Sequence, residues 1–555
     1  MAVNIDKDAC IGCGACVGGC PVGALSLDDE GKSVCDEGTC IDCGSCVGTC
    51  PVGAITSNSN LNTFAKLSAW HFFSKGDHMK QKPGWVLPDL KEAQKRTTNT
   101  IDRIDTFNIP EAARMMGRGK KYFISTYGCQ ANERDSETLA GILDELGFAP
   151  NETAEGSDVI IINTCAIRQN AEEKVLGEIG NFKRLYRENK DLVIGVCGCM
   201  AQEEGLVETL LTKYPQVRLL FGTHNIQELP SMLYSCMVEG KKVVKIYSKE
   251  GEVYENLPVH RFGTFKAWVN IMYGCDKFCT YCIVPYTRGK QRSRKMSEIL
   301  KEVQQLKDEG YKEITLLGQN VNAYGKDMDN EQDFATLLEE VAKIGIPRVR
   351  FTTSHPWDFS EEMIDIIAKY DNIMPFIHLP LQSGDDDVLK LMGRRYTKES
   401  YLALYDKIVN TIPNVSVSTD IIVGFPNETD EQFEHTLDVV RYCKYDNAFT
   451  FIFSARPGTP ASRMHDSIDM ETKRKRLAKL NKTWNDLALE KNKAYVGRTV
   501  TVLVDGLSKK NEKVYSGYTD TQKLVNFKGE NIQPGDFVEV KITEAKSFSL
   551  DGVAV

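Results

Sequence analysis

The feature that most constrains this chain is a cysteine-rich unit that occurs twice near its start. Between Cys10 and Pro21, four cysteines are separated by two, two and three residues, and a proline follows the fourth. The same spacing returns between Cys40 and Pro51. The 555 residues contain 18 cysteines in all, and such clustering in a chain of this length indicates metal ligation rather than disulfide bonds.

This doubled spacing resembles that of the bacterial two-cluster ferredoxins, in which the fourth cysteine of each run ligates the other 4Fe-4S cluster. The resemblance implies that one cluster is held by Cys10, Cys13, Cys16 and Cys50, and the other by Cys40, Cys43, Cys46 and Cys20. A pair of zinc sites is the alternative, although zinc requires neither three evenly spaced ligands nor a fourth before proline. Residues 1–57 are therefore expected to form a two-cluster electron-transfer domain.

A second cysteine group, Cys275, Cys279 and Cys282, follows a predicted strand with the spacing Cys-x-x-x-Cys-x-x-Cys. Three thiolates can hold three irons of a 4Fe-4S cubane, which leaves the fourth iron open to a chelating ligand. The loop resembles that of the radical-SAM superfamily, in which the open iron binds S-adenosylmethionine and an electron from the cluster cleaves the sulfonium to a 5′-deoxyadenosyl radical. A zinc knuckle would be the alternative for an isolated loop of this kind.

The predicted fold class is α/β and multidomain. From residue 120 to 245, short apolar strands alternate with charged helical stretches, which predicts a parallel α/β domain. The same alternation over residues 260–490 predicts a partial (β/α)6 barrel, with strands at residues 267–272, 313–317, 348–353, 375–379, 415–423 and 448–453. Residues 494–555 have the strand period and turns of a small OB-like β-barrel, and residues 58–119 are expected to be a linker and an extension.

Three further cysteines stand alone in the first of these domains: Cys129, Cys165 and Cys199. Each follows the end of a predicted strand, and the loops of a parallel sheet converge on one edge. Taken by themselves these residues favour plain buried thiols, because free cysteine is commonly buried.

The segments around these cysteines resemble the methylthiotransferase family, and so do the stretches 267–275 and 283–292. Further matches are Gly222–Asn225, Leu317–Asn322, Phe351–Pro356, His378–Gly384 and Thr419–Pro426. The resemblance runs from about residue 100 to the C-terminus. It implies that Cys129, Cys165 and Cys199 hold an auxiliary 4Fe-4S cluster whose open iron carries the sulfur to be transferred, while Cys197 is a bystander.

The substrate expected within that family is read from the same segments. Relatives acting on threonylcarbamoyl adenosine tend to have Ala-Arg-Gly after the cysteine loop, and those acting on a ribosomal-protein aspartate tend to have Gly-Cys-Pro-Lys-Asn at the first single cysteine. This chain has Thr287-Arg288-Gly289, Gly128-Cys129-Gln130 and Arg168. The resemblance therefore implies that tRNA is the partner, and that a prenylated adenosine beside the anticodon is thiomethylated. A non-catalytic electron carrier is the rival from another class.

Polar groups at strand ends of the barrel are candidates for contacts with S-adenosylmethionine or the base: Tyr281, Gln319, Thr352, Ser354, Gln382 and Asp420, with His378 and Arg456 beside them. Each could equally be satisfied by the backbone, and His378 could be a core histidine. Candidates for RNA phosphate contact are Arg288, Lys290, Arg292 and Arg294, with Lys509 and Lys510 in the C-terminal barrel, which resembles the RNA-binding TRAM module. A solvated charged face is the alternative for such a run.

The net charge of -9 is concentrated at the N-terminus, because residues 1–60 hold eight acidic residues against two lysines and so contribute -6 of it. The remaining -3 is compatible with RNA binding. No run approaches the roughly 20 apolar residues of a membrane span, and the N-terminus lacks the apolar core of a signal peptide, so a cytosolic monomer is expected. The N-terminal domain is expected to supply the electron in cis, unless residues 1–80 belong to an adjacent reading frame.

Overall fold

The computed structural model describes residues 3–7, 10, 15–18, 24–28, 32–36, 54–56, 101–166, 169–203, 205–246, 252–328, 332–352, 354–508 and 511–555. The chain divides into two compact units, Met1–Gln81 and Lys82–Val555. None of the helices in these ranges is both long and apolar enough to cross a membrane.

The first unit is built from two short antiparallel ladders. Strand β1 (Asn4–Ile5) pairs with β4 (Ile55–Thr56), so the beginning and the end of the cysteine repeat lie together. Strand β2 (Leu25–Leu27) pairs with β3 (Ser33–Cys35), and helix α1 (Ala15–Gly18) precedes them. The small buried core consists of Val3, Cys16, Leu25 and Ile55.

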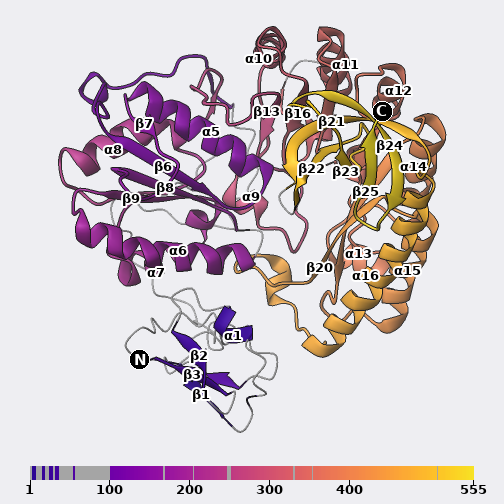
Figure 1. Cartoon of the computed structure of the whole chain (residues 1–555), viewed down its shortest axis with the longest axis horizontal. Helices are drawn as coiled ribbons and strands as arrows, with labels where there is room; N and C mark the ends of the chain where they lie inside the picture. Colours follow the sequence, from indigo (N-terminus) through magenta and orange to yellow (C-terminus); the bar gives the residue numbers. More distant parts are fainter. Residues whose placement is uncertain are drawn as a thin grey trace. The chain divides into compact units, whose positions relative to one another are not determined.

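The second unit begins with a six-stranded sheet in the order β11-β10-β9-β8-β6-β7, in which every neighbouring pair is parallel (Figure 1). Its strands are β6 (Lys121–Thr126), β7 (Ala149–Pro150), β8 (Val159–Thr164), β9 (Val193–Gly198), β10 (Val217–Phe221) and β11 (Val243–Lys245). The central strands β8 and β9 are buried along their whole length, as expected for parallel strands covered on both faces. The predicted parallel α/β domain is therefore confirmed.

Four helices cover the two faces of that sheet. Helices α5 (Gln130–Glu145) and α8 (Leu229–Met237) contribute to one core, and α6 (Gln169–Glu188) and α7 (Leu206–Lys213) contribute to the other. The first two turns of α5 are unusual because they bury polar side chains, including Asn132, Asp135 and Glu137. Those turns face the next domain.

The barrel follows, and the prediction of six parallel strands is confirmed. The strands are β13 (Lys266–Asn270), β16 (Glu313–Leu317), β17 (Arg348–Phe351), β18 (Phe376–His378), β19 (Ser416–Val423) and β20 (Asn447–Ile452). They form the parallel sheets β13-β16-β17 and β18-β19-β20, which an isolated parallel bridge between Val349 and Ile373 connects. Within the described ranges no ladder joins β13 to β20, so the barrel is open on that side.

Helices wrap the outside of this barrel (Figure 1). They are α10 (Met296–Asp308), α11 (Phe334–Ile344), α12 (Glu361–Lys369), α14 (Lys398–Thr411), α15 (Asp430–Cys443) and α16 (Met470–Lys493). Their apolar faces and the outward side chains of the strands make one large core, in which Leu338, Leu437 and Leu480 are fully buried.

The C-terminal domain is a closed barrel in the order β21-β22-β23-β25-β24, as the strand period predicted. Its strands are β21 (Thr499–Ser508), β22 (Asn511–Tyr518), β23 (Leu524–Lys528), β24 (Phe537–Ala545) and β25 (Leu550–Ala554). It contacts the amino ends of the large barrel's strands: Lys266 Nζ lies 2.6 Å from Asp505, and the Arg348 guanidinium donates to Tyr518 O at 2.8 Å. The carboxyl ends of those strands are therefore free to carry the site.

Candidate active site

The Cys275 loop leaves the carboxyl end of β13 and is closed by a short ladder. Strand β14 (Met272–Tyr273) pairs antiparallel with β15 (Arg292–Ser293), and the Cys275 N–H donates to Gly289 O at 3.1 Å. Gly274 has φ +68, and a Cβ there would lie 2.0 Å from Lys290 O. Only glycine fits that turn, so the backbone itself defines where the cysteines begin.

The three cysteines of this loop are drawn together in a buried setting. Burial raises the pKa of Cys275 and Cys282 to about 12, and the neighbouring thiols of the same loop add to the effect. The backbone N–H of Lys277 points at Cys275 Sγ at 3.4 Å. Buried thiols that receive N–H groups are suitable ligands for an iron–sulfur cluster.

Three sulfur donors on one loop fit a cluster better than a single ion. A tetrahedral ion needs its sulfur ligands about 2.3 Å from a common centre, whereas a cubane takes each thiolate on a different iron. The donor set therefore fits the expected 4Fe-4S group.

The three single cysteines lie at the carboxyl ends of three neighbouring strands. Cys129 comes shortly after β6, while Cys165 and Cys199 directly follow β8 and β9. Gly128 has φ +124, and a Cβ there would lie 2.3 Å from the Cβ of Cys165. The structure thus brings these three residues to one edge of the sheet, as the rule for parallel strands predicted.

The thiols of this second group differ in their charge state. The pKa of Cys129 is lowered to about 5, first by a hydrogen bond from Cys165 and then, against burial, by the charge of Arg288 and by two N–H groups of α5. Burial raises the pKa of Cys199 and raises that of Cys197 further. Cys129 is therefore a thiolate at neutral pH without any metal, which is the form that ligates iron.

Arg288 connects the two cysteine groups. It follows α9 (Val284–Thr287), the helix just beyond Cys282, and its guanidinium donates to Asn132 Oδ1 at 2.8 Å and Asp135 Oδ2 at 2.7 Å on α5. On the same segment, Ile283 packs against Cys199 in a small apolar cluster. The residues from Cys282 to Arg288 therefore lie directly against the loops of the other three cysteines.

Three of the expected RNA contacts are wrong. Arg288, Arg292 and Arg294 are buried, with exposed fractions of 6%, 4% and 4%. Arg294 forms ion pairs with Glu255 at 2.9 Å and Glu302 at 2.6 Å. Arg288 and Arg294 neutralise acidic side chains instead of facing solvent. Asp135 and Glu255 are distant from them in the sequence, whereas Glu302 lies eight residues after Arg294.

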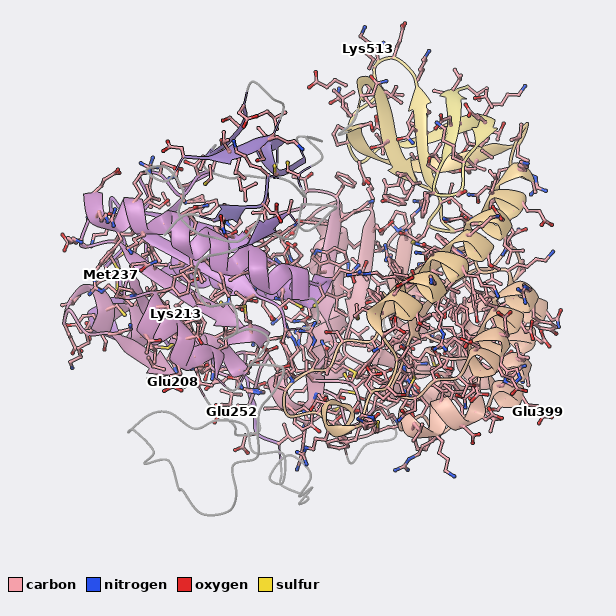
Figure 2. The ribbon with its side chains drawn as sticks, turned by 90° about the horizontal axis from the view of Figure 1, so that it is seen from below. Glu208, Lys213, Met237, Glu252, Glu399 and Lys513 are labelled. Atoms are coloured by element: carbon pink, nitrogen blue, oxygen red, sulfur yellow. The ribbon has the colours of Figure 1, made fainter. Side chains whose placement is uncertain are left out.

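The lysines considered for RNA phosphate contact differ in their exposure to solvent. Lys290 is half-buried. Lys509 and Lys510 lie outside the described residues, but neighbouring Lys513 is exposed and points outward from the C-terminal barrel (Figure 2). Lys523 of the same barrel is buried and lies 2.9 Å from Asp446, so it is not an RNA contact.

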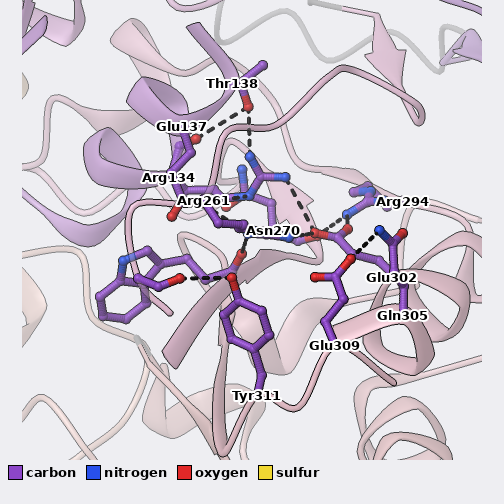
Figure 3. Close-up of polar contacts among 12 residues, drawn as sticks. Arg134, Glu137, Thr138, Arg261, Asn270, Arg294, Glu302, Gln305, Glu309 and Tyr311 are labelled. Atoms are coloured by element: carbon purple, nitrogen blue, oxygen red, sulfur yellow. Dashed lines mark hydrogen bonds and ion pairs between the residues drawn. The ribbon is translucent and has the colours of Figure 1, made fainter. Parts of the chain in front are cut away.

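A buried charge network holds the helix of Cys129 against the large barrel (Figure 3). The Glu302 carboxylate of α10 lies 3.4 Å from Arg134, 2.5 Å from Arg261 and 2.6 Å from Arg294. Burial opposes ionisation of Glu302, but the three guanidinium groups outweigh it and hold its pKa at about 2. Because Arg134 belongs to α5, this network sets the separation between the two cysteine groups.

The candidates for S-adenosylmethionine contact lie around the mouth of the barrel. Gln319 and Thr352 are half-buried just beyond β16 and β17. Ser354 is 3% exposed, and its Oγ has no hydrogen-bond partner among the described residues. Gln382 has φ +67, a strained conformation for a side-chain-bearing residue. A buried hydroxyl without a hydrogen-bond partner and a strained backbone are features typical of a ligand-binding site.

His378 and Asp420 form a pair on the inner face of the barrel. His378 Nδ1 lies 2.8 Å from Ser418 Oγ, and its Nε2 lies 3.4 Å from Asp420 Oδ2. With 16% of its side chain exposed, His378 is mostly buried, and both of its ring nitrogens face polar groups.

Sequence reasoning missed a half-buried cation near the Cys275 loop. The Arg394 guanidinium lies 6.0 Å from the ring centre of Tyr281 and 5.8 Å from that of Tyr396, and it interacts with Cys279 and Cys282. It also missed His224, whose pKa is lowered to about 3 by burial and then by Arg292 and Arg288. No spacing of residues in one sequence signals either contact.

In the N-terminal unit the structure describes two of the eight predicted ligands. The Ser33 N–H points at Cys10 Sγ at 3.5 Å, and Ser33 Oγ lies 3.2 Å from Cys16 Sγ, so both cysteines lie beside β3. The other six, Cys13, Cys20, Cys40, Cys43, Cys46 and Cys50, lie outside the described residues.

Four protein families match consecutive parts of the chain. Residues 9–54 match the 4Fe-4S dicluster domain and residues 121–222 the uncharacterized protein family UPF0004. Residues 269–440 match the radical SAM superfamily and residues 493–555 the TRAM domain.

Curated relatives match most of the chain. A tRNA-2-methylthio-N(6)-dimethylallyladenosine synthase of Bacillus cytotoxicus is 56% identical over 469 residues, covering 84% of this chain and 92% of that protein. The protein of the same name from Staphylococcus saprophyticus is 55% identical, covering 84% and 91%. A solved structure of the radical S-adenosylmethionine methyltransferase TsrM from Kitasatospora setae is 14% identical, with a TM-score of 0.46, covering 62% of this chain and 75% of that one.

Proposed function

Because the chain belongs to the family of tRNA-2-methylthio-N(6)-dimethylallyladenosine synthases, we propose that it converts N6-isopentenyladenosine beside the anticodon of tRNA to its 2-methylthio derivative. The observation that carries this proposal is the meeting of two separate three-cysteine groups through the segment from Cys282 to Arg288. An electron carrier without a reaction of its own would need neither group in that arrangement. We further propose that the enzyme acts as a cytosolic monomer.

The residues divide the chemistry between the two groups. Cys275, Cys279 and Cys282 would hold a 4Fe-4S cluster with one iron open to S-adenosylmethionine, and Cys129, Cys165 and Cys199 would hold the auxiliary cluster. When bound, these groups supply the reducing electron, the substrate-activating radical and the sulfur to be transferred. Arg288 balances the negative charge of the Cys129 thiolate, and buried Ile283 keeps water away from Cys199.

The barrel mouth and the C-terminal barrel would bind the other reactants. Gln319, Thr352, Ser354, Gln382 and Asp420 are proposed to contact S-adenosylmethionine or the base. The anticodon loop is single-stranded, so presenting one adenine to the site requires no duplex opening. Lys290 and Lys513 are proposed phosphate contacts, because solvent reaches both of them. Lys509 and Lys510, which lie outside the described residues, are proposed from the sequence alone.

Mass spectrometry of nucleosides tests the substrate assignment. Expression of the protein in cells that lack this modification is expected to convert N6-isopentenyladenosine in tRNA to its 2-methylthio form. The Cys275→Ala, Cys279→Ala, Cys282→Ala variant is the control and should give none. Accumulation of 2-methylthio threonylcarbamoyl adenosine, or a mass shift in a ribosomal peptide without any change in nucleosides, would contradict the proposal.

The N-terminal unit is proposed to deliver the reducing electron within the same chain. Its match to the 4Fe-4S dicluster domain supports that role. A truncated protein starting at Lys82 is expected to keep its activity with a strong chemical reductant and to lose most of it with cellular reductants.

The matched control is the full chain with Cys10→Ser and Cys16→Ser, which should behave like the truncated protein with cellular reductants. Full activity of the Lys82 form with native reductants would contradict the electron-donor role. Detection of a single full-length polypeptide in cells would exclude two adjacent reading frames.

A further inference from the structure

One face of the β18-β19-β20 sheet lines the inside of the barrel. In the parallel register, His378 pairs with Ser418, Asp420 with Phe449, and Ile422 with Phe451. Paired residues of neighbouring strands point to the same side, and alternate residues along a strand share a face. His378, Asp420, Ile422, Phe449 and Phe451 therefore belong to a single face.

The opposite face of the β18-β19-β20 sheet is covered by helices. The face that carries Phe449 and Phe451 therefore points into the barrel. Ala448 belongs to the core shared with Leu480 of α16, and Thr450 Oγ1 donates to Asn481 of the same helix at 2.6 Å. Because Ala448 and Thr450 point outward to α16, Phe449 and Phe451 point into the barrel.

These two phenylalanines are unusually exposed. Phe449 is 45% exposed and Phe451 is 39% exposed, although both lie in a strand of the barrel. Phe449 makes an edge contact with the His378 ring, with 5.9 Å between ring centres. An exposed apolar pair beside polar groups is typical of a surface that a ligand covers.

This apolar surface continues into the radical-SAM site. Ile422, the register partner of Phe451, packs against the same cluster of buried side chains as Tyr281, the neighbour of Cys282. The apolar face that carries the two phenylalanines therefore extends, through Ile422, to the cluster that also contacts Tyr281 beside Cys282.

We propose that Phe449 and Phe451 bind the five-carbon prenyl group of the substrate adenosine and so select prenylated over unmodified tRNA. The inference rests on the proposed function. A prenyl group has no hydrogen-bonding atoms, and the two phenyl rings offer it an apolar surface without unsatisfied polar partners. Asp420 and His378 lie beside the rings, where they can face the polar base while the rings contact its substituent.

Binding of two matched RNAs tests the proposal. Anticodon stem-loops with either N6-isopentenyladenosine or plain adenosine are titrated into the full-length, cluster-loaded protein under anaerobic conditions, and fluorescence anisotropy gives both Kd values. Phe449→Ala and Phe451→Ala are each expected to lower the preference for the prenylated RNA roughly tenfold, because each removes about one ring of apolar contact. Affinity for the plain RNA should not change.

Leucine variants separate apolar packing from base stacking. Phe449→Leu and Phe451→Leu should keep most of the preference, because leucine still packs against a prenyl chain but does not stack on a base. Phe262→Ala, an exposed phenylalanine in the segment before β13, is the matched control and should behave as the wild type. If an alanine variant fails to load iron, the valine variant at the same position replaces it, because valine retains a strand-forming side chain. The valine variants are expected to lose less of the preference for the prenylated RNA than the alanine variants.

The outcomes are distinct. Equal loss of affinity for both RNAs, or equal effects of leucine and alanine, would assign the rings to the base and overturn the proposal. An unchanged preference in every variant would overturn it as well. If the wild type neither prefers nor thiomethylates the prenylated RNA, the proposed function itself is contradicted. If the wild type is active but the substitutions do not change the preference for the prenylated RNA, only the role of the phenylalanines is contradicted.

Discussion

Replacing Cys129, Cys165 and Cys199 together with alanine is expected to remove about four iron atoms per chain and to abolish thiomethylation, while S-adenosylmethionine is still cleaved. The physical reason is that these residues lie on loops separate from the Cys275 group, so their loss leaves the other ligand set intact. Iron and sulfide analysis with cluster spectroscopy on anaerobically purified protein, and chromatography of the cleavage product, measure the two effects.

The matched control for this triple variant is Cys197→Ala combined with Cys236→Ala. Both are buried thiols of the same domain that belong to its apolar core rather than to the loop edge. They should leave the iron content unchanged at a modest cost in stability. An unchanged iron count in the triple variant would make Cys129, Cys165 and Cys199 structural thiols, and the enzyme would then be a radical-SAM protein of unknown product.

Replacing Arg288 with methionine is expected to lower the free energy of unfolding by about 3–5 kcal/mol and to weaken retention of the auxiliary cluster. The substitution leaves Asp135 buried without its cation, and it removes the positive charge beside Cys129. Urea unfolding of the apo protein measures the stability, and iron content after anaerobic dialysis measures cluster retention.

A second substitution separates the two roles of Arg288. Adding Asp135→Asn to Arg288→Met is expected to restore most of the stability, because no uncompensated charge remains, but not the cluster retention. Arg184→Met, which breaks an exposed pair with Glu155 and Glu188, serves as the control and should cost less than about 1 kcal/mol. Full retention of iron by Arg288→Met would show that the guanidinium only supports the fold.

Much of the architecture followed from local patterns. The bounds of the six barrel strands were predicted to within two residues of β13, β16, β17, β18, β19 and β20, because short apolar runs alternate there with helical stretches. The meeting of Cys129, Cys165 and Cys199 was predictable for a similar reason, since each lies within three residues of the end of a strand and parallel strands end at one edge.

The basic run after the cysteine loop shows where local patterns fail. Arg288, Arg292 and Arg294 read as a solvated or RNA-binding stretch, yet Arg288 pairs with Asp135 and Arg294 with Glu255 and Glu302. Asp135 and Glu255 lie far from these arginines in the chain, and the eight-residue separation between Arg294 and Glu302 is not a spacing that predicts an ion pair. The contacts of half-buried Arg394 with Tyr281 and Tyr396 were not predicted, because Tyr281 lies far from Arg394 in the chain.

The sequence alone determined the ligand chemistry and the order of the domains, because cysteine spacing and hydrophobic period are properties of neighbouring residues. It could not assign a direction to Phe449 and Phe451, since Thr450 is the single polar residue of the run from Ala448 to Phe453 and both faces of that run carry apolar side chains. Only the tertiary structure decided which cations are buried, which ring faces the barrel and how the two cysteine groups meet. Each of those outcomes depends on contacts between residues far apart in the chain.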